Sequence, residues 1–415
     1  MTAILTHPSS ELHAITGSGC VSARRPPAAS SGRYFADEPG EGSGRRGLLD
    51  RYTLLSVARI GIVGFPNVGK TTLFNALTGL EAPTAAHPFS TIEPNVGVAK
   101  VPDADLDEAA LVEESVKLVH ATLELLDLPA MAKPGHGGGF GAQILGRLRD
   151  METLAVVLRA FEDDSVPADE SGTDPLAQAQ ELLLELALAD YEVFERRREK
   201  VAKEATADAG KRGAAEAIAR ATALLEQGTQ LRTERWERDH LAAFRDLAPL
   251  TLKPAVWVVN VGEDAGQVDD LVQELESLVP EGDTVVVVSA KLEEEGALLA
   301  PEDRRELFEG LGLGEGALAK VVRAAYAAMD LISFYTLGPK EAHAWTVRKG
   351  AKAPEAAGKI HSDLERGFIR AEIVPIAVVI ADGGWDESKK AGHIRVEGKD
   401  YTVAESDVIV VRFSV

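Results

Sequence analysis

One stretch constrains the fold more than any other: residues 58–72, with the sequence ARIGIVGFPNVGKTT. Within it, residues 64–71 fit the pattern G-x-x-x-x-G-K-[ST], with an apolar run before them at 60–63 and a helical pattern after them from residue 72. Glycines let a backbone turn tightly enough for successive N–H groups to point at phosphate oxygens, and the N-terminus of the next helix adds partial positive charge. A strand, a glycine-rich turn and a helix in this order predict a phosphate-binding loop in an α/β sheet, rather than a chance match on a glycine-rich turn.

This loop and two later segments supply candidates for phosphate and Mg²⁺ chemistry. Lys70 is expected to reach the β- and γ-phosphates, and the hydroxyl of Thr71 is expected to bind Mg²⁺. Asp127 ends an apolar, strand-like segment that starts at Val119, where a second Mg²⁺ anchor acting through water is expected; a helix cap or a surface carboxylate is the alternative. Thr91 lies in a proline-rich loop and is the candidate switch threonine, whose hydroxyl reaches Mg²⁺ only while the γ-phosphate is present; a solvated threonine is the alternative.

Two further strand ends are candidates for holding the base. In guanine-nucleotide switches, an N-K-x-D motif supplies the Lys and Asp that recognise guanine, and an S-A-K loop donates backbone N–H groups to its O6 atom. Here Asn260 is present, but Val261 stands in place of the Lys and Glu263 in place of the Asp. Ser289 and Ala290 begin an S-A-K sequence after the next apolar strand. Because the longer Glu263 places its carboxylate differently, the guanine-specific fork is not assured, and adenine is the better prediction.

Composition limits the classes of function. The chain has 415 residues, which predicts two or three domains, and a net charge of −22, which argues against non-specific binding of nucleic acid by the whole surface but leaves room for a local basic patch. Cys20 is the single cysteine, so a disulfide framework and a cysteine-based zinc site are excluded. No apolar run reaches the roughly 18 residues of a membrane span, and the N-terminus lacks the apolar core of a secretory signal. We therefore expect a soluble, cytoplasmic protein without a membrane partner.

The pattern along the chain predicts three parts and one insertion. Residues 1–56 are rich in Ser, Gly, Pro and Arg, and predict a disordered tail or upstream sequence from a misplaced start site; a functional arm is the alternative. Residues 57–331 predict a P-loop nucleotide-binding domain of the G-domain type, with an antiparallel helical hairpin inserted at about 174–246, where helical periodicity and charge are high. Residues 332–415 alternate in short strands and predict a small α+β, β-grasp module with a binding role.

For two other groups of polar residues we prefer an interpretation without a functional role. Arg196–Arg198 on the hairpin could contact RNA, but such a charge run usually marks a solvated helix face. His361, Asp363 and His393 could be imagined as metal ligands, but their spacing matches no standard site.

Together these motifs resemble the Obg-like ATPases, the YchF family of translation-factor-related P-loop NTPases, over about residues 57–415. The most specific matching segments are 64–72 (GFPNVGKTT), 88–95 (PFSTIEPN), 181–190 (ELLLELALAD), 251–254 (TLKP), 344–347 (AWTV), 361–372 (HSDLERGFIRAE) and 396–401 (VEGKDY).

The resemblance implies a nucleotide domain with a hairpin insertion, a C-terminal TGS domain, and ATP preferred over or alongside GTP. It also implies a ribosomal partner, with RNA contact through the hairpin or the TGS-like domain. For the site, it implies Mg²⁺ ligation by Thr71 and Thr91 and contact of Val261 with adenine. The residues that it implies for phosphate binding are Asn67, Val68, Gly69, Lys70, Thr71 and Thr72.

The sequence departs from the family after Asp127. Ala130 stands where the family usually has a glycine whose N–H senses the γ-phosphate; alanine keeps the N–H but cannot reach the same backbone angles. Met131 stands where related GTPases carry the glutamine that positions water. An apolar side chain cannot orient water, which fits the hydrophobic substitution of the family that the chain resembles and a slow intrinsic rate. His136 in the following glycine-rich loop is a possible substitute, although a solvated loop histidine is the simpler reading.

We therefore expect a slow, Mg²⁺-dependent NTPase, an ATPase before a GTPase, that acts as a ribosome-associated switch. The first alternative is a nucleotide-gated binding module with weak or lost hydrolysis, which the residues after Asp127 favour. The second is a conventional GTPase.

Overall fold

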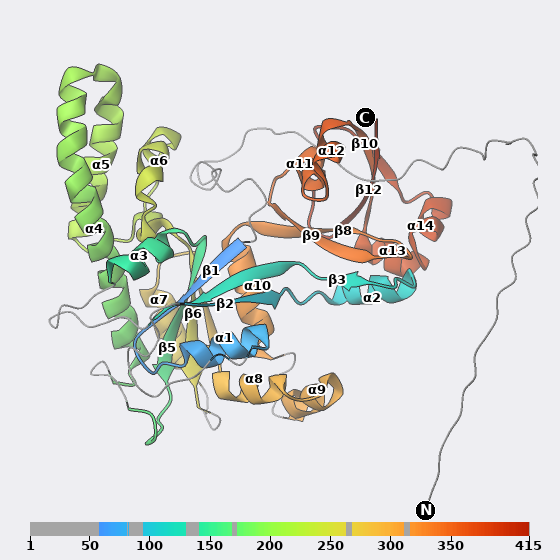
Figure 1. Cartoon of the computed structure of the whole chain (residues 1–415), viewed down its shortest axis with the longest axis horizontal. Helices are drawn as coiled ribbons and strands as arrows, with labels where there is room; N and C mark the ends of the chain where they lie inside the picture. The colour runs from blue at the N-terminus through green and yellow to red at the C-terminus, as the bar shows by residue number, and fades with distance from the viewer. Residues whose placement is uncertain are drawn as a thin grey trace, which may run out of the picture. The chain divides into compact units, whose positions relative to one another are not determined.

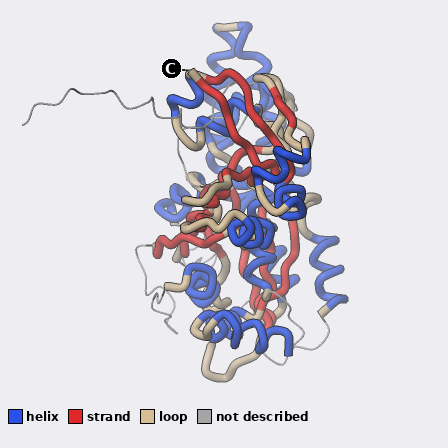
Figure 2. Tube along the Cα trace, turned by 90° about the vertical axis from the view of Figure 1, so that its right-hand side faces the viewer, coloured by secondary structure: helices blue, strands red, loops and turns tan. Residues whose placement is uncertain are grey.

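The computed structural model describes residues 58–80, 82, 94–129, 141–167, 172–262, 268–310 and 316–414, and the statements below concern these residues. They form two six-stranded sheets with helices packed along them (Figures 1 and 2). The tail predicted for residues 1–56 lies outside them. None of the helices in the described ranges is long and apolar enough to cross a membrane.

The first sheet has the strand order β2-β4-β1-β5-β6-β7, in which β2 is antiparallel to β4 and the other neighbours are parallel. Its strands are β1 (Ala58–Val63), β2 (Asn95–Lys100), β4 (Thr122–Asp127), β5 (Thr153–Ala160), β6 (Ala255–Val261) and β7 (Thr284–Val288). The central strands β5 and β6 are buried almost throughout, which explains their continuous apolar sequences. The α/β sheet predicted from the sequence is confirmed.

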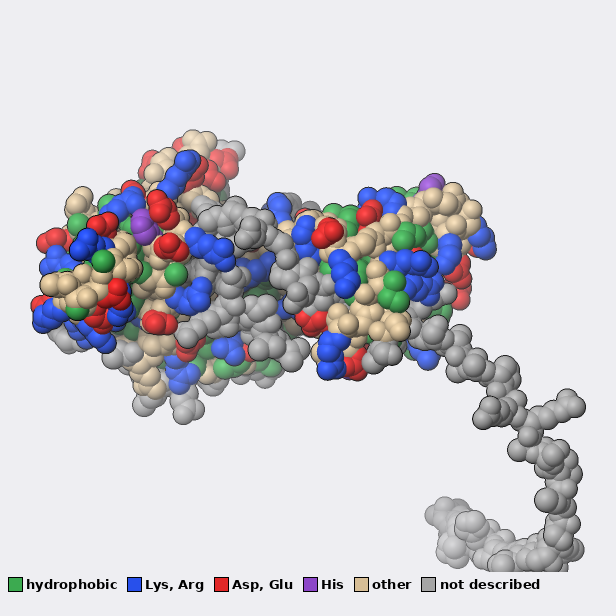
Figure 3. Space-filling model, turned by 90° about the horizontal axis from the view of Figure 1, so that it is seen from above, with side chains coloured by type: hydrophobic (Ala, Val, Ile, Leu, Met, Phe, Trp, Pro, Cys, Tyr) green, Lys and Arg blue, Asp and Glu red, His purple; other side chains and the backbone are tan. Residues whose placement is uncertain are grey.

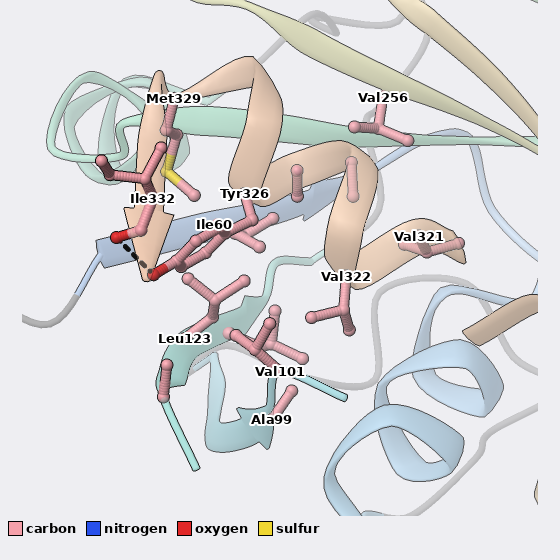
Figure 4. Close-up of a cluster of buried hydrophobic side chains, with 14 of the residues drawn as sticks. Ile60, Ala99, Val101, Leu123, Val256, Val321, Val322, Tyr326, Met329 and Ile332 are labelled. Atoms are coloured by element: carbon pink, nitrogen blue, oxygen red, sulfur yellow. Dashed lines mark hydrogen bonds between the residues drawn. The ribbon is translucent and has the colours of Figure 1, made fainter. Parts of the chain in front are cut away.

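The helices around this sheet lie between its strands in the chain or follow its last strand, β7. They are α1 (Lys70–Thr78), α3 (Ala142–Arg149), α7 (Asp269–Leu278), α8 (Ala290–Ala297), α9 (Pro301–Gly310) and α10 (Ala317–Ala328). Figure 4 shows Val322 and Tyr326 of α10 facing Ile60 of β1 and Leu123 of β4. This contact places α10 between the first sheet and the strand β8 that follows it.

The helical hairpin predicted in the middle of the chain is present. It consists of α4 (Pro175–Ala207) and α5 (Arg212–Glu226), followed by α6 (Arg238–Phe244) (Figure 1). Phe194, Trp236 and Phe244 give the hairpin a core of its own, with edge-on ring contacts at 5.2 and 4.8 Å. A 3₁₀ turn at Ala209–Lys211 joins the two helices and leads directly into α5.

The predicted basic run on the hairpin behaves as a solvated face. Arg198 pairs with Glu195 at 2.6 Å, one helical turn away. On the face of the molecule shown in Figure 3, Lys and Arg side chains are interspersed with Asp and Glu.

The second sheet has the order β11-β10-β12-β8-β9-β3. Its strands are β3 (Leu118–Val119), β8 (Leu331–Thr336), β9 (Ala342–Arg348), β10 (Phe368–Pro375), β11 (Arg395–Glu397) and β12 (Asp407–Phe413), and its helices are α2 (Ala104–Val112), α11 (Ala353–Gly358), α12 (Ser362–Arg366), α13 (Ile376–Asp382) and α14 (Trp385–Ala391). Within the part predicted to alternate in short strands, residues 400–403 form no strand and make one isolated bridge, from Thr402 to Lys352. Within the described ranges, no cluster of three His, Cys, Asp or Glu residues suits a metal, so His361, Asp363 and His393 form no site.

A strand that lies between two strands of the first sheet in the sequence belongs to the second sheet, which the sequence did not reveal. The segment expected as one strand from Val119 to Asp127 is divided, and its first part, β3, pairs in parallel with β9 of the second sheet. Helix α2 precedes β3, and its capping residue Asp103 accepts a hydrogen bond from the hydroxyl of Tyr335 at 2.7 Å. Residues between β2 and β4 therefore belong to the packing of the second sheet.

A buried polar network fixes the hairpin to the first sheet. Asp190 on α4 is fully buried, and its Oδ1 accepts from the guanidinium of Arg149 at 2.7 Å. Its Oδ2 accepts from both the backbone N–H and the hydroxyl of Thr251, each at 2.8 Å. Lys253 donates to the carbonyl of Arg149 at 3.0 Å. The segments ELLLELALAD (181–190) and TLKP (251–254) thus meet in space, and the polar residues Asp190, Thr251 and Lys253 have a structural role.

Replacement of Asp190 by Ala should strongly destabilise the protein. It leaves the partly buried Arg149 guanidinium without its carboxylate partner and the buried donors of Thr251 without their acceptor, which costs about 3–5 kcal/mol. Urea denaturation followed by far-UV circular dichroism measures the change. Glu192→Ala, an exposed position on the same helix, is the control and should change the free energy of unfolding by less than about 0.5 kcal/mol. A loss of under about 1 kcal/mol for Asp190→Ala would contradict this account.

Candidate nucleotide-binding site

The turn between β1 and α1 has the backbone of a phosphate-binding loop. Gly64 and Gly69 have φ angles of 152° and 95°, in the region that favours glycine, and Asn67 has a φ of 58°. A Cβ atom on Gly69 would lie 2.2 Å from Nδ2 of Asn260, and one on Gly64 would lie 2.5 Å from the carbonyl oxygen of Val157. Both glycines are therefore required by conformation and by close approach of their neighbours.

Lys70 is the first residue of α1 and is buried at the turn. Its Nζ donates to the carbonyl of Phe65 at 2.7 Å, so the ammonium group closes back onto the loop. Burial lowers the pKa of Lys70 to about 8, and the negative charge of Asp127 partly opposes this shift. The side chain is thus a cation held in a poorly solvated position, where the negative charge of a phosphate would favour its protonated form.

Thr71 and Asp127 come together as predicted for a metal site. The Thr71 hydroxyl donates to Oδ2 of Asp127 at 2.8 Å, because β1 and β4 are adjacent and parallel and both point their carboxyl ends at the loop. The same Oδ2 accepts from Nδ2 of Asn95 at 3.1 Å. Oδ1 of Asp127 is buried and has no hydrogen-bond partner among the described residues. A buried carboxylate oxygen beside a hydroxyl suits Mg²⁺, which prefers oxygen ligands and retains several waters.

Asn260 connects the phosphate loop to the loop after β7, where the sequence predicts that the base binds. Its Nδ2 donates to the carbonyl of Val68 at 2.9 Å, and its Oδ1 accepts from the backbone N–H of Ala290 at 3.0 Å. Strands β6 and β7 pair in parallel up to Asn260 and Val288, so their carboxyl ends meet at one edge. The hydroxyl of Ser289 is buried there without a partner among the described residues. Loops at the carboxyl ends of neighbouring parallel strands are the usual place for a ligand in such a sheet.

The described structure brings most of the predicted site residues together at this edge of the first sheet. They are Asn67, Val68, Gly69, Lys70, Thr71, Thr72, Asp127, Asn260, Val261, Ser289 and Ala290. The remaining predicted residues, Thr91, Glu263, Ala130, Met131 and His136, lie outside the described residues.

Sequence reasoning missed Arg159 beside the loop. This residue is 2% exposed on β5, and its guanidinium donates to the carbonyls of Val166, Pro167 and Asn67 at 2.9, 3.1 and 3.4 Å. Its own backbone is held by Gln178 of α4 through two hydrogen bonds of 2.8 and 3.0 Å. An arginine within an otherwise apolar strand sequence was the available signal. Asn95 was also missed, although it ends the quoted segment PFSTIEPN.

Comparison with known proteins gives matches along the whole described chain. A family described as "50S ribosome-binding GTPase" matches residues 59–188, and the YchF-GTPase C-terminal family, described as a protein of unknown function, matches residues 331–414. The chain is 39% identical over 360 residues to the "Ribosome-binding ATPase YchF" of Escherichia coli O157:H7, covering 86% of this chain and 99% of that protein. It is 33% identical to "Obg-like ATPase 1" of Oryza sativa subsp. indica, covering 89% and 95%. The solved structure of the Schizosaccharomyces pombe YchF GTPase superimposes with a TM-score of 0.74 at 28% identity, covering 86% and 97%.

The lowered pKa of Lys70 predicts that nucleotide affinity depends on pH. Phosphates bind the protonated lysine better, so binding raises its pKa above the value of about 8 in the free protein. Affinity should therefore be level below about pH 7 and fall roughly tenfold toward pH 9, as the free protein loses this proton. Titration calorimetry near pH 8.5 in two buffers of different ionisation enthalpy should show proton uptake on binding. Affinity that stays constant to about pH 9 without proton uptake would contradict the assignment.

Proposed function

The chain belongs to the YchF family of P-loop NTPases, the Obg-like ATPases, and from this membership we propose a slow, Mg²⁺-dependent nucleoside triphosphatase. Its substrate is ATP, preferred over GTP or accepted alongside it, and it acts as a switch on the ribosome. The observation that carries this proposal is the meeting of Lys70, Thr71 and Asp127 at one glycine-shaped loop.

The residues at the loop have distinct roles in hydrolysis. The backbone N–H groups from Asn67 to Thr72 bind the phosphate oxygens, and Lys70 leaves the carbonyl of Phe65 to pair with the β- and γ-phosphates. Water attacks the γ-phosphorus, the bond to the bridging oxygen breaks, and the charge on that oxygen is stabilised by Lys70 and the loop amides. Mg²⁺, when bound, neutralises charge on the β- and γ-oxygens. Thr71, Asp127 and Thr91 are the groups that we assign to hold it.

The base end of the site supports adenine. Both polar ends of the Asn260 amide are used, one on Val68 and one on Ala290, so this side chain braces two loops. The choice between adenine and guanine then depends on the residues that follow Asn260 in the chain. Val261 is apolar and half-buried, and it offers no charge to the base, where guanine-specific sites carry a lysine. We retain Glu263, Ser289 and Ala290 as base-contacting residues in this proposal.

A ribosomal partner is supported by the relatives and by the distribution of charge. The bacterial relatives from Escherichia coli and Bacillus subtilis are named ribosome-binding ATPases. Residues 331–415 carry 12 Lys and Arg and 12 Asp and Glu, so this part is neutral although the whole chain has a net charge of −22. A neutral module approaches RNA with far less repulsion than the rest of the chain. We therefore place the RNA contact on the TGS-like part at 332–415, with the hairpin as the second candidate.

Lys70→Ala should abolish nucleotide-dependent turnover. Loss of this charge removes stabilisation of the transferring phosphoryl group, so we expect a fall of at least about a hundredfold in the rate of γ-phosphate release. Single-turnover assays with radiolabelled ATP, with and without ribosomes, measure it, and Lys100→Ala on the exposed edge of β2 is the control. Unchanged turnover in Lys70→Ala would refute the site. Wild-type protein that binds ATP but never hydrolyses it, even with ribosomes, would favour the nucleotide-gated binding module.

The residues proposed to contact the base predict that ATP binds at least as tightly as GTP. Titration of the purified chain with fluorescent ATP and GTP analogues in Mg²⁺ measures the two affinities. Asn260→Ala should weaken both nucleotides alike, because its amide braces the loops and does not select the base. A clear preference for GTP, lost in Asn260→Ala, would instead assign the protein to the conventional GTPases.

A further inference from the structure

We propose that Asn95 is the positioning residue of the metal site, which orients the Asp127 carboxylate so that its Oδ1 faces the cation. This inference rests on the proposed function, since it assumes that Asp127 serves Mg²⁺. It adds a residue that has no place among the phosphate, metal or base contacts assigned above.

The strand register sets these two side chains against each other. Asn95 is the first residue of β2, and it lies directly opposite Asp127, the last residue of β4, in the antiparallel ladder. Its Nδ2 donates to Oδ2 of Asp127 at 3.1 Å. Opposite residues in an antiparallel pair have close side chains, so this hydrogen bond follows from the sheet itself. Rotation of the carboxylate is thereby restricted on one side.

The two oxygens of Asp127 are used very differently. Oδ2 accepts from both Asn95 and Thr71, whereas Oδ1 is buried and unpartnered among the described residues. A carboxylate that is 6% exposed and leaves one oxygen without a donor is costly unless that oxygen meets a cation or an ordered water. The arrangement therefore points Oδ1 into the metal site and keeps Oδ2 for orientation.

Thr71 has a second task once a metal is bound. In the proposed function its hydroxyl oxygen is a ligand, so its geometry is then set by the cation rather than by Asp127. Asn95 has no such second task, and its neutral amide donates to the carboxylate without competing for the metal. Partners of this kind fix the orientation of a ligand, and their loss typically costs about 10–100-fold in metal affinity.

The position of Asn95 in the chain links this orientation to the switch loop. It follows Pro94 and lies four residues after Thr91, the candidate switch threonine. One short segment thus supplies both a proposed metal-binding hydroxyl and the amide that orients the opposing carboxylate.

The test compares the Mg²⁺ requirement of nucleotide binding in the full chain. The dissociation rate of a fluorescent ATP analogue is measured over a Mg²⁺ titration and again in excess EDTA, for wild type, Asn95→Ala, Asp127→Asn and Val96→Ala. Val96, 56% exposed, is the next residue of β2 with its side chain on the other face, and serves as the matched control. We expect Asn95→Ala to raise the Mg²⁺ concentration for half-maximal slowing by about tenfold, with the rate in EDTA unchanged.

The outcomes separate the inference from the function on which it rests. A shift in Asn95→Ala and Asp127→Asn, without one in Val96→Ala, supports it. A shift in Asp127→Asn alone overturns the role of Asn95 and leaves the metal site intact. No shift in either variant overturns the metal site and the inference with it. An Asn95→Ala protein that melts at a lower temperature and releases nucleotide faster in EDTA, with an unshifted Mg²⁺ midpoint, shows a merely structural role and overturns the proposal.

Discussion

The close approach of Gly69 to the amide of Asn260 is the constraint on which the site depends. An added Cβ at Gly69 would lie 2.2 Å from Nδ2, so the loop can reach the end of β6 only with glycine there. That approach lets the Asn260 amide donate to the carbonyl of Val68 and accept from the N–H of Ala290. The loop after β1 and the loop after β7 are thereby joined before any ligand binds, which would lower the ordering cost of binding the proposed nucleotide.

The helical hairpin is tied to this site by a continuous element. Helix α4 has 33 residues and so runs for about 50 Å. Near its start, Gln178 bonds to the backbone of Arg159, whose guanidinium reaches the carbonyl of Asn67 in the phosphate loop. Farther along, Asp190 is locked to Arg149 and Thr251. A rigid helix with buried polar contacts at two points has little freedom to move independently of the sheet beneath it.

The two sheets are likewise not independent modules. Strand β3 arises between β2 and β4 of the first sheet but adds to the edge of the second, and Asp103 before α2 accepts from Tyr335 of β8. Burial and the nearby Asp103 carboxylate raise the pKa of Tyr335, so its hydroxyl remains a donor over the whole physiological range. The segment after β2, which follows the candidate switch loop, thus contacts the module that we propose to meet RNA.

The sequence by itself determined the phosphate loop, the α/β sheet and the hairpin, because these depend on local patterns: glycine spacing, apolar strands and helical periodicity. It also predicted that Lys70, Thr71 and Asp127 share a site, since parallel strands end at a common edge. Only the tertiary structure decided the partners of Asp127 and Asn260, because Asn95 and Val68 come close through strand register and backbone approach rather than through sequence spacing. The same holds for β3: its two residues carry too little periodicity to specify a strand, so their pairing depends on which sheet edge lies within reach.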